Sequence, residues 1–371
     1  MINFRLLRTL FSFSLVIGPL ACQPETIKDS GMSMAHDNQH DVCENTFATI
    51  SMPDQQITEY GSEIPTIESV LPELLSETDL YTNITSSEVH PAMRWFKPAY
   101  ELWSDGESKN RWVYIPECEQ IDTSNMNDWS FPVGTRFFKE FSVDGIKVET
   151  RYVYRLGPGK REYAFVSYLW NEEQTEAYKV SADGMTQVLG TQHDIPSREQ
   201  CVECHGTAPK GGGRPSRGLG FSAIMLSEAT QGVSLNDLIN DAILSDPPQH
   251  SIQIPGNTTD KDALGYLHIN CGTCHNQSDD GLPQFDMNLW LDVEHTSAVE
   301  SNAWKTTVGV DTQVFKDQHI SGRIVPGNPE TSALYYRMSH RDDVAQMPPV
   351  GTKLVDTEGI AIISEWIESL P

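Results

Sequence analysis

The pattern of apolar and polar positions divides the chain into a polar N-terminal stretch, a β-rich middle and a helical end. Short runs rich in β-branched and aromatic residues predict strands at 112–115, 136–143, 146–155, 163–170 and 177–180. Apolar and charged residues alternate along 146–155, so we expect this strand to have one buried and one solvent-exposed face. Asp144-Gly145 precedes it and predicts a tight hairpin turn, because glycine accepts the positive φ of a two-residue loop.

Helical periodicity replaces the strand pattern after residue 199. Apolar positions predict helices at 235–244, 260–270 and 356–370, and short helices around 67–75. The helix over 260–270 places Ala263, Leu264, Leu267 and Ile269 on one side. Pro255-Gly-Asn257 lies just before it and predicts a domain boundary.

The N-terminus has the pattern of a signal peptide. Arg5 and Arg8 precede an apolar run at 9–20, which is too short to span a membrane, and Ala21-Cys22 follows. A small residue before a cysteine also indicates a bacterial lipoprotein site, although Pro19 stands where such sites usually carry leucine. We therefore predict a protein of the periplasm or outer envelope, attached to the membrane through lipidated Cys22, with ordinary cleavage as the alternative.

The acidic composition limits the classes of partner. The net charge is −26, and cleavage after residue 21 would remove Arg5 and Arg8 but no acid, which gives −28 for the mature chain. Such a charge argues against nucleic acid and anionic membrane surfaces as partners. A solvated acidic surface or a basic partner protein fits better.

Four of the seven cysteines lie in two pentads of the form C-x-x-C-H. Cys201 and Cys204 precede His205, and Cys271 and Cys274 precede His275. This spacing matches the two vinyl groups of a haem, and the adjacent histidine is placed to bind the iron. The sequence therefore predicts two covalently attached haem c groups.

Other interpretations of the pentads are a zinc site, a thioredoxin-like redox pair and coincidence. Zinc would need reduced cysteines in an oxidising compartment, and a redox pair would not need the histidine twice. The remaining cysteines are Cys22 at the signal junction and the pair Cys43 and Cys118. That pair predicts a disulfide, with two buried thiols as the alternative.

The second pentad lies in a setting typical of a small monohaem cytochrome. A helix leads into Cys271, and a terminal helix follows Met347-Pro-Pro349. Met347 is predicted to be the distal iron ligand, because the prolines after it restrict its loop. Met338 and His340 are the alternatives.

The distal ligand of the first haem is harder to name. Met225 follows His205 in an apolar stretch and is the favoured residue. The other possibilities are His193, His250 and His268, and an open sixth position is a further one. His268 lies on the helix that leads into the second pentad, where a supporting role fits better.

The chain resembles a family of diheme c-type cytochromes of Gram-negative bacteria, many of them predicted lipoproteins. The resemblance runs from about Tyr100 to the C-terminus. It rests on the segments ELWSD (101–105), FPVGT (131–135), ETR (149–151), YLWN (168–171), ALGYLHINC (263–271), PGNP (326–329) and MPP (347–349). It implies an N-terminal β domain fused to haem-bearing segments, with haem attached at the two pentads.

Together these features predict an α+β multidomain protein with an antiparallel β domain, haem-binding segments and an all-α, class I-like cytochrome c domain. The predicted division is a signal peptide (1–21), an acidic polar tether (22–85), a β-rich domain (86–195), a first haem-binding segment (196–256) and a cytochrome c domain with the second haem (257–371).

Three functions fit these predictions. The favoured one is transfer of electrons between other redox proteins, without catalysis. The alternative is a peroxidase-like diheme enzyme whose first haem has an open sixth position. A third is a binding or sensing role for the β domain, although Trp103, Trp112, Trp129 and Trp170 fit a core better than a binding surface.

Overall fold

The computed structural model describes residues 45–50, 70–159, 162–205, 218–276, 286–341 and 345–371. All of them belong to one compact unit that begins at residue 43. The predicted signal peptide, Cys22, Cys43 and most of the predicted tether lie outside the described residues.

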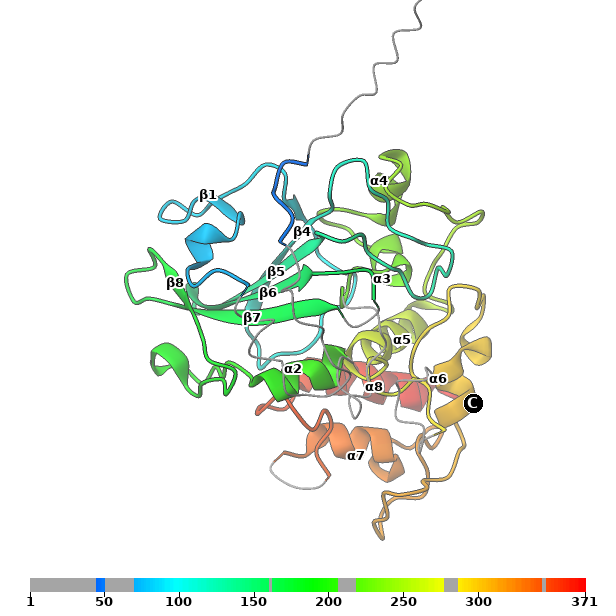
Figure 1. Ribbon diagram of the computed structural model, residues 1–371. Helices are drawn as coiled ribbons and strands as arrows, with labels where there is room; N and C mark the ends of the chain where they lie inside the picture. The colour runs from blue at the N-terminus through cyan, green and yellow to red at the C-terminus, as the bar shows by residue number, and fades with distance from the viewer. Residues whose placement is uncertain (1–44, 51–69, 160–161, 206–217, 277–285, 342–344) are drawn as a thin grey trace, which may run out of the picture. The chain divides into compact units, whose positions relative to one another are not determined.

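A six-stranded antiparallel sheet is formed by strands that pair in sequence order (Figure 1). The strands are β3 (Arg94–Trp95), β4 (Ser108–Tyr114), β5 (Arg136–Val143), β6 (Ile146–Arg155), β7 (Tyr163–Trp170) and β8 (Ala177–Lys179). A separate pair joins β1 (Tyr81–Asn83) to β2 (Glu88–Val89). All five strands predicted from the sequence lie in the large sheet, and β5, β6 and β7 have the predicted bounds.

The α-helices of the described chain follow the sheet in sequence. They are α2 (Arg198–His205), α3 (Ala223–Ser227), α4 (Leu235–Asn240), α5 (Thr258–Asn270), α6 (Asn302–Thr307), α7 (Ala333–Ser339) and α8 (Thr357–Ser369). Short 3-10 helices are η1 (Leu75–Glu77), η2 (Val188–Gly190), η3 (Ala298–Glu300) and η4 (Pro329–Thr331). The predicted helices at 235–244, 260–270 and 356–370 correspond to α4, α5 and α8.

The turn between β5 and β6 is the predicted tight hairpin. Asp144 and Gly145 have φ of 49° and 81°, and Val143 pairs with Ile146 across them. Positive φ at both central residues is the type I′ pattern, whose twist matches that of antiparallel strands. A bulge then shifts the pairing by one residue between Phe141 and Ser142, and the turn and the bulge together place Lys139 opposite Arg151.

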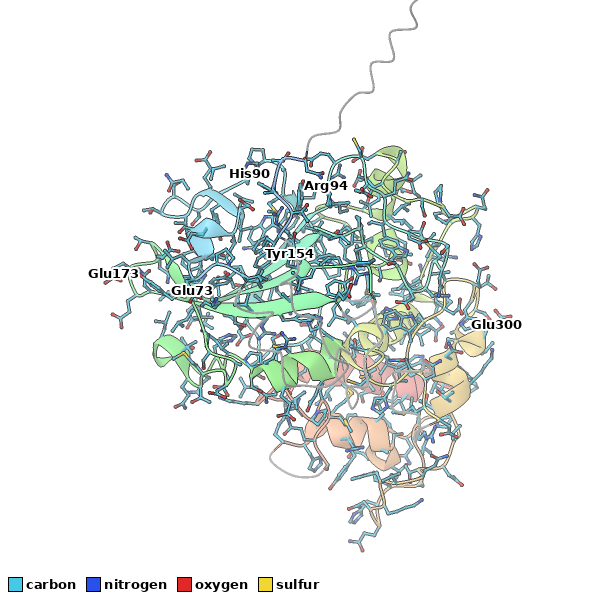
Figure 2. All side chains as sticks on the ribbon, viewed as in Figure 1. Glu73, His90, Arg94, Tyr154, Glu173 and Glu300 are labelled. Carbon is cyan, nitrogen blue, oxygen red and sulfur yellow. The ribbon has the colours of Figure 1, made fainter. Side chains whose placement is uncertain are left out.

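One face of the sheet packs against the segment that precedes it. Leu71, Leu75 and Leu80 are buried in a cluster with the aromatic side chains of Tyr152 and Trp170. The described end of the segment assigned to a tether thus contributes to the core. Figure 2 shows Tyr154 within the sheet, Glu173 at the end of the sheet near β8, and Glu300 away from the sheet in η3, beside α6.

The other face of the sheet meets the helices, and the prediction of a solvent-exposed face on 146–155 is wrong. Glu149 and Arg155 are buried, Arg151 is half-buried, and Ile146 is 50 % exposed. Arg155 donates hydrogen bonds to the carbonyls of Pro158 and Gly159, which explains its burial. Alternation identified two faces correctly, but both of them are covered.

Helices α5 and α8 pack against each other and carry the apolar core of the C-terminal part. Tyr266 donates a hydrogen bond of 2.9 Å to Asp356, and Trp366 donates one of 3.0 Å to Asp260. The four residues predicted for the apolar side of α5 are all buried. At Gly265 a Cβ would lie 2.3 Å from the ring of Tyr100, so glycine allows the chain to pass close to the helix.

The predicted fold class is confirmed at its coarser level: an antiparallel sheet combined with helices.

Candidate functional site

The first pentad lies within α2. Cys201 and Cys204 are three positions apart, so their side chains project from one side of the helix, and His205 follows one turn after Cys201. The ring of His205 packs on that of Phe165 in β7, with 4.9 Å between centroids. The helix therefore rests on the sheet and holds all three side chains in fixed positions.

The second pentad forms a helical turn directly after α5. The backbone amides of Cys274 and His275 donate to the carbonyl of Cys271 over 3.1 and 2.8 Å. A Cβ at Gly272 would lie 2.6 Å from the carbonyl oxygen of His268 and 2.9 Å from that of Leu289. Only glycine fits at this x position of the pentad, because two backbone segments approach it.

The two pentads meet, although they are far apart in the sequence. The side chains of Cys204 and Cys274 lie close enough to interact, and this interaction raises the pKa of Cys204 and lowers that of Cys274. Burial raises the pKa of Cys201 to about 11 and that of Cys271 to about 12. All four cysteines are free thiols.

The imidazole of His275 is held in its neutral form. Burial is the main cause, and the guanidinium groups of Arg337 and Arg323 add to it, which lowers the pKa of His275 to about 4. Neutral imidazole is the form that binds a metal ion. No group of three or more His, Cys, Asp or Glu side chains that could hold a metal ion occurs in the described parts of the chain.

A cavity of about 680 Å³ lies against the first pentad. Cys201, Cys204 and His205 line it, and so does Cys274 of the second pentad. Apolar side chains of β5, β6 and β7 line it as well, and these are Phe137, Val153 and Phe165. Its volume is within the range of about 300 to 1,000 Å³ that is typical of sites for small molecules and cofactors.

A row of cationic side chains crosses the cavity face of the sheet. Arg111 of β4 is paired with Lys139 of β5, Lys139 with Arg151 of β6, and Arg151 with Ser167 of β7. These side chains lie on one face because they are directly opposite one another in an antiparallel register. All four line the cavity.

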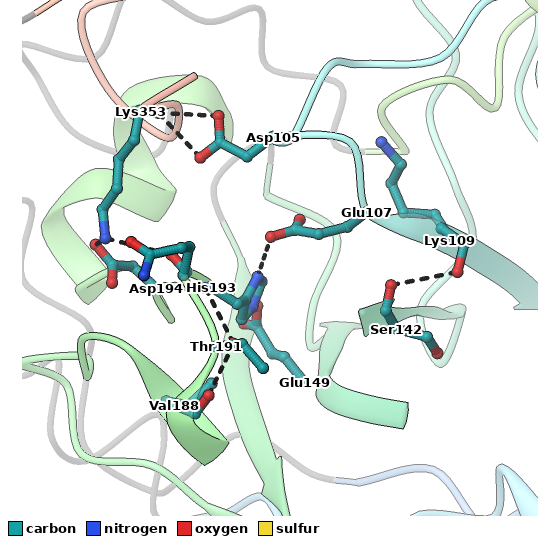
Figure 3. A network of polar contacts seen from close by, with 12 residues as sticks. Asp105, Glu107, Lys109, Ser142, Glu149, Val188, Thr191, His193, Asp194 and Lys353 are labelled. Carbon is teal, nitrogen blue, oxygen red and sulfur yellow. Dashed lines mark hydrogen bonds and ion pairs between the residues drawn. The ribbon is translucent and has the colours of Figure 1, made fainter. Parts of the chain in front are cut away.

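A buried acid and histidine network lies beside this row (Figure 3). His193 is held between two carboxylates, with Nδ1 2.5 Å from Glu107 and Nε2 2.8 Å from Glu149. Glu149 also accepts two hydrogen bonds from Arg151 and one from Ser167. Both ring nitrogens of His193 therefore have a carboxylate partner.

The segment that follows Met347 is fixed against the sheet side of the cavity. Asp105 accepts hydrogen bonds from the backbone amides of Lys353 and Leu354, over 2.9 and 2.8 Å. Figure 3 shows Lys353 between Asp105 and Asp194, whose carboxylate is 2.6 Å from the lysine Nζ. Residues 348–353 line the same cavity as the first pentad.

Met347 and its alternatives have different surroundings. Met347 is half-buried, and its backbone amide donates to the carbonyl of Arg337. Met338 is buried in the core on α7. His340 stacks on Tyr336, and its Nδ1 lies 2.5 Å from the Tyr336 carbonyl oxygen. The assignment of Met347 as iron ligand stays a prediction.

The residues proposed as distal ligand of the first haem do not gather at the cavity. Met225 is fully buried in the core on α3 and is not among the cavity-lining residues. His268 accepts a hydrogen bond from the backbone amide of Leu291, and His250 is exposed near Glu294. Of these four residues only His193 lines the cavity.

The cationic row and the cavity were not predicted from the sequence. A signal was present at Lys139, which follows two phenylalanines in β5, whereas Arg111 and Arg151 follow polar residues in their strands. Their meeting depends on the register of three strands, which the sequence alone did not supply.

Comparison of the chain with family models, curated proteins and solved structures found no match. Among the described helices, none is long and apolar enough to cross a membrane. Cys118 is disulfide-bonded, and its partner lies outside the described residues.

Proposed function

We propose that this chain is a c-type cytochrome with two covalently attached haems that passes electrons between other redox proteins. The single observation that carries the proposal is the meeting of the two C-x-x-C-H pentads, whose thiols of Cys204 and Cys274 are in contact. Two isolated motifs could each arise by chance. Two that converge at one cavity are the arrangement that electron exchange between neighbouring groups requires.

The residues of the first pentad fit a haem. Two thiols on one face of α2 would form the thioethers, and His205 would bind the iron. Phe165 packs on the imidazole of His205 and limits its rotation. When bound, the haem supplies reversible one-electron exchange at its iron. The apolar part of the cavity wall excludes water from that site, which influences its reduction potential.

The C-terminal part supports the finer prediction of a cytochrome c domain. Helices α5 and α8 pack against each other, the second pentad follows α5, and the Met347 loop precedes α8. Met347 is proposed as the distal ligand, because a thioether is a soft donor that favours ferrous iron. The hydrogen bond from the Met347 amide to the carbonyl of Arg337 holds the loop in place at Met347.

A second candidate function is a diheme peroxidase-like enzyme, and one observation favours it. Met225, the predicted distal ligand of the first haem, lies in the core and does not line the cavity beside His205. His193 does line it, but carboxylates occupy both of its ring nitrogens. With these two residues engaged elsewhere, a haem at His205 would keep its sixth position open to a small substrate.

The proposed location is the periplasm or outer envelope, with attachment through lipidated Cys22. It rests on the charge and hydropathy pattern of residues 1–22 and on the oxidising conditions that a disulfide at Cys118 requires. The proposed donor and acceptor are redox proteins with basic surfaces, since the chain carries a net charge of −26.

Intact-mass measurement of the chain produced in a host that matures c-type cytochromes tests the proposal. We expect a mass increase of two haems in the unaltered chain. The double variants C201A/C204A and C271A/C274A should each retain one haem, and C118A should retain both. A chain that carries no haem contradicts the proposal.

Absorption spectroscopy of the same sample separates the two functions. An electron carrier with both axial positions filled should give low-spin ferric bands at both haems and no turnover of peroxide. A high-spin ferric band that is lost in C201A/C204A, together with peroxide turnover, would assign the enzymatic function to the first haem.

A further inference from the structure

The cationic row on the cavity face of the sheet has no balance within the fold. Arg111, Lys139 and Arg151 are directly opposite one another across three strands. Like charges at directly opposed positions destabilise a sheet. The chain as a whole carries a net charge of −26, so a row of positive side chains at this one place calls for an explanation.

Two of the three cations have acidic partners. Arg111 lies 2.8 Å from Glu101, and Arg151 lies 2.8 Å from Glu149. Glu101 is therefore paired with Arg111. Glu149 is paired with Arg151 and also bonds to His193 and Ser167.

Lys139 differs from its neighbours. In the described part of the chain no carboxylate lies within ion-pair distance of its Nζ, which is 4.6 Å from the centre of the Phe141 ring. Burial and the charges of Arg111, Lys109 and Arg151 lower the pKa of Lys139 well below its usual value. A half-buried amine among other cations is unfavourable until an anion joins it.

The wider group confirms the excess of positive charge. The cations are Lys109, Arg111, Lys139, Arg151 and protonated His193, and the carboxylates are Glu101, Glu107 and Glu149. With all of them charged, the positive groups outnumber the negative ones, and Arg198, which also lines the cavity, adds a further cation. The remaining acids at the cavity wall are engaged or exposed: Asp194 pairs with Lys353, Asp105 accepts from two backbone amides, and Asp183 is exposed.

The row shares its cavity with the first pentad. Cys201, Cys204 and the three cations all line the cavity. A group tethered to these thiols must extend into this space. The two carboxylates of a haem leave the macrocycle at the edge opposite the vinyl groups that bind the thiols, so they would lie away from Cys201 and Cys204 within this space. Unbalanced positive charge in the cavity favours their binding.

We propose that Arg111, Lys139 and Arg151 form a carboxylate-binding wall that holds the propionates of the haem attached at Cys201 and Cys204. This inference rests on the proposed function. Lys139 supplies the charge that no protein carboxylate uses, and Arg111 and Arg151 add guanidinium donors suited to carboxylates.

The variant Lys139→Met tests the wall, because it removes the unpaired charge without leaving a carboxylate alone. Lys139→Arg keeps the charge and serves as the conservative variant. Lys305→Met is the matched control for net charge, since Lys305 is exposed on α6 and does not line the cavity. Intact mass first establishes that each chain carries two haems.

Lys139→Met should shift the thermal unfolding midpoint in opposite directions in two backgrounds. In the C201A/C204A background, which lacks the first haem, Lys139→Met should raise the unfolding midpoint because a crowded half-buried cation is removed. In the chain with both haems it should lower the midpoint, because a propionate loses its partner. A change of the same sign in both backgrounds overturns the proposal.

A redox titration supplies a second measurement. Lys139→Met should lower one of the two midpoint potentials, because a cation beside the propionates stabilises the reduced haem, while Lys139→Arg and Lys305→Met should leave both near their original values. The potential that moves should be the one that C201A/C204A removes. Equal potentials in Lys139→Met and Lys305→Met overturn the proposal.

Addition of acetate distinguishes propionates from a free anion as the source of the carboxylate. The chain with both haems should show no saturable spectral change, because the wall is already filled. A saturable change that is lost in Lys139→Met assigns the wall to a free carboxylate and overturns the proposal. Absence of haem in the intact mass overturns the proposed function and this inference together, whereas two haems with unmoved potentials overturn this inference alone.

Discussion

Glu149 Oε2 lies 2.8 Å from Nε2 of His193, and both side chains are buried between the sheet and the segment that follows β8. Glu149 accepts further hydrogen bonds from Arg151 and Ser167, so its two oxygens are fully used. This carboxylate joins strands β6 and β7 to His193 and thus fixes one side of the cavity.

Replacement of Glu149 by Gln should strongly destabilise the fold. The change leaves the half-buried Arg151 and the buried His193 without a shared anion, and breaking a buried ion pair typically costs about 3–5 kcal/mol of unfolding free energy. Urea unfolding of E149Q measures it. The control Glu173→Gln, at an exposed position (Figure 2), should change the unfolding free energy by less than about 0.5 kcal/mol. Equal stabilities of the two variants would contradict the assigned role of Glu149.

Stability should also depend on pH through His193. Burial lowers the pKa of His193, but hydrogen bonds and charges from Glu107 and Glu149 outweigh burial and raise the pKa to about 9. A raised pKa means that the imidazolium stabilises the fold fully below about pH 6.5, and that this contribution is lost as the pH rises through about 9. Unfolding free energy should therefore decline between these two values.

The variant His193→Gln tests the assignment, because its stability should lack this decline. Two amines also change the stability over this pH range. Burial lowers the pKa of Lys109 to about 8 and lowers that of Lys139 as well, so their deprotonation makes stability rise with pH, opposite to the effect of His193. The difference between the two chains therefore isolates the contribution of His193. At acid pH both chains should lose stability, because Arg151 keeps the pKa of Glu149 low in each of them; in the unaltered chain His193 adds to this, and the pKa of Glu149 is about 2. If the unfolding free energies of the two chains decline equally at alkaline pH, His193 is not the group responsible for the decline.

The sequence predicted local structure well wherever a few neighbouring residues determine it. Asp144-Gly145 specified its turn, and the bounds of β5, β6 and β7 followed from short apolar runs between turn residues. The four apolar residues predicted on α5 are buried, but so is every other residue from 263 to 270, so the spacing identified the helix and not a single apolar side. Each of these features is decided within about ten residues of chain.

The cavity could not be predicted in this way. Alternation along β6 separated Tyr152 from Arg151, but it could not show that α2 and the segment at 180–198 cover the charged face. The meeting of Cys204 with Cys274 likewise depends on the packing of α2 and α5 against one sheet. The pentads named the candidate site residues, and only the tertiary structure placed them together.

Replacement of Met347 by Ala should abolish the weak long-wavelength charge-transfer band of a methionine-ligated ferric haem. Met347 lies in a loop fixed by its hydrogen bond to Arg337, whereas Met338 is buried in the core. Met338→Ala is therefore the matched control: it should lower stability by about 2–5 kcal/mol and keep the band. A band that persists in Met347→Ala would refute the ligand assignment.

Loss of the disulfide at Cys118 should destabilise the unit by about 2–5 kcal/mol. Cys118 is disulfide-bonded, and Cys43 is the partner predicted from the cysteine count. Cys43→Ala and Cys118→Ala should therefore lower the unfolding midpoint equally, and the double variant should add nothing further. Peptide mapping without reduction identifies the pair directly. A linkage of Cys118 to Cys22 would contradict the predicted pairing.

The contact between Cys204 and Cys274 predicts that the two proposed haems influence each other magnetically and electrostatically. Groups tethered to touching thiols lie close together, and charges nearer than about 10 Å are little screened by salt. The low-temperature electron paramagnetic resonance spectrum of the oxidised chain should therefore differ from the sum of the C201A/C204A and C271A/C274A spectra. Cys118→Ala should leave the spectrum unchanged. If the two single-haem spectra add up to that of the unaltered chain, the haems are not magnetically coupled, which contradicts the closeness of the two pentads.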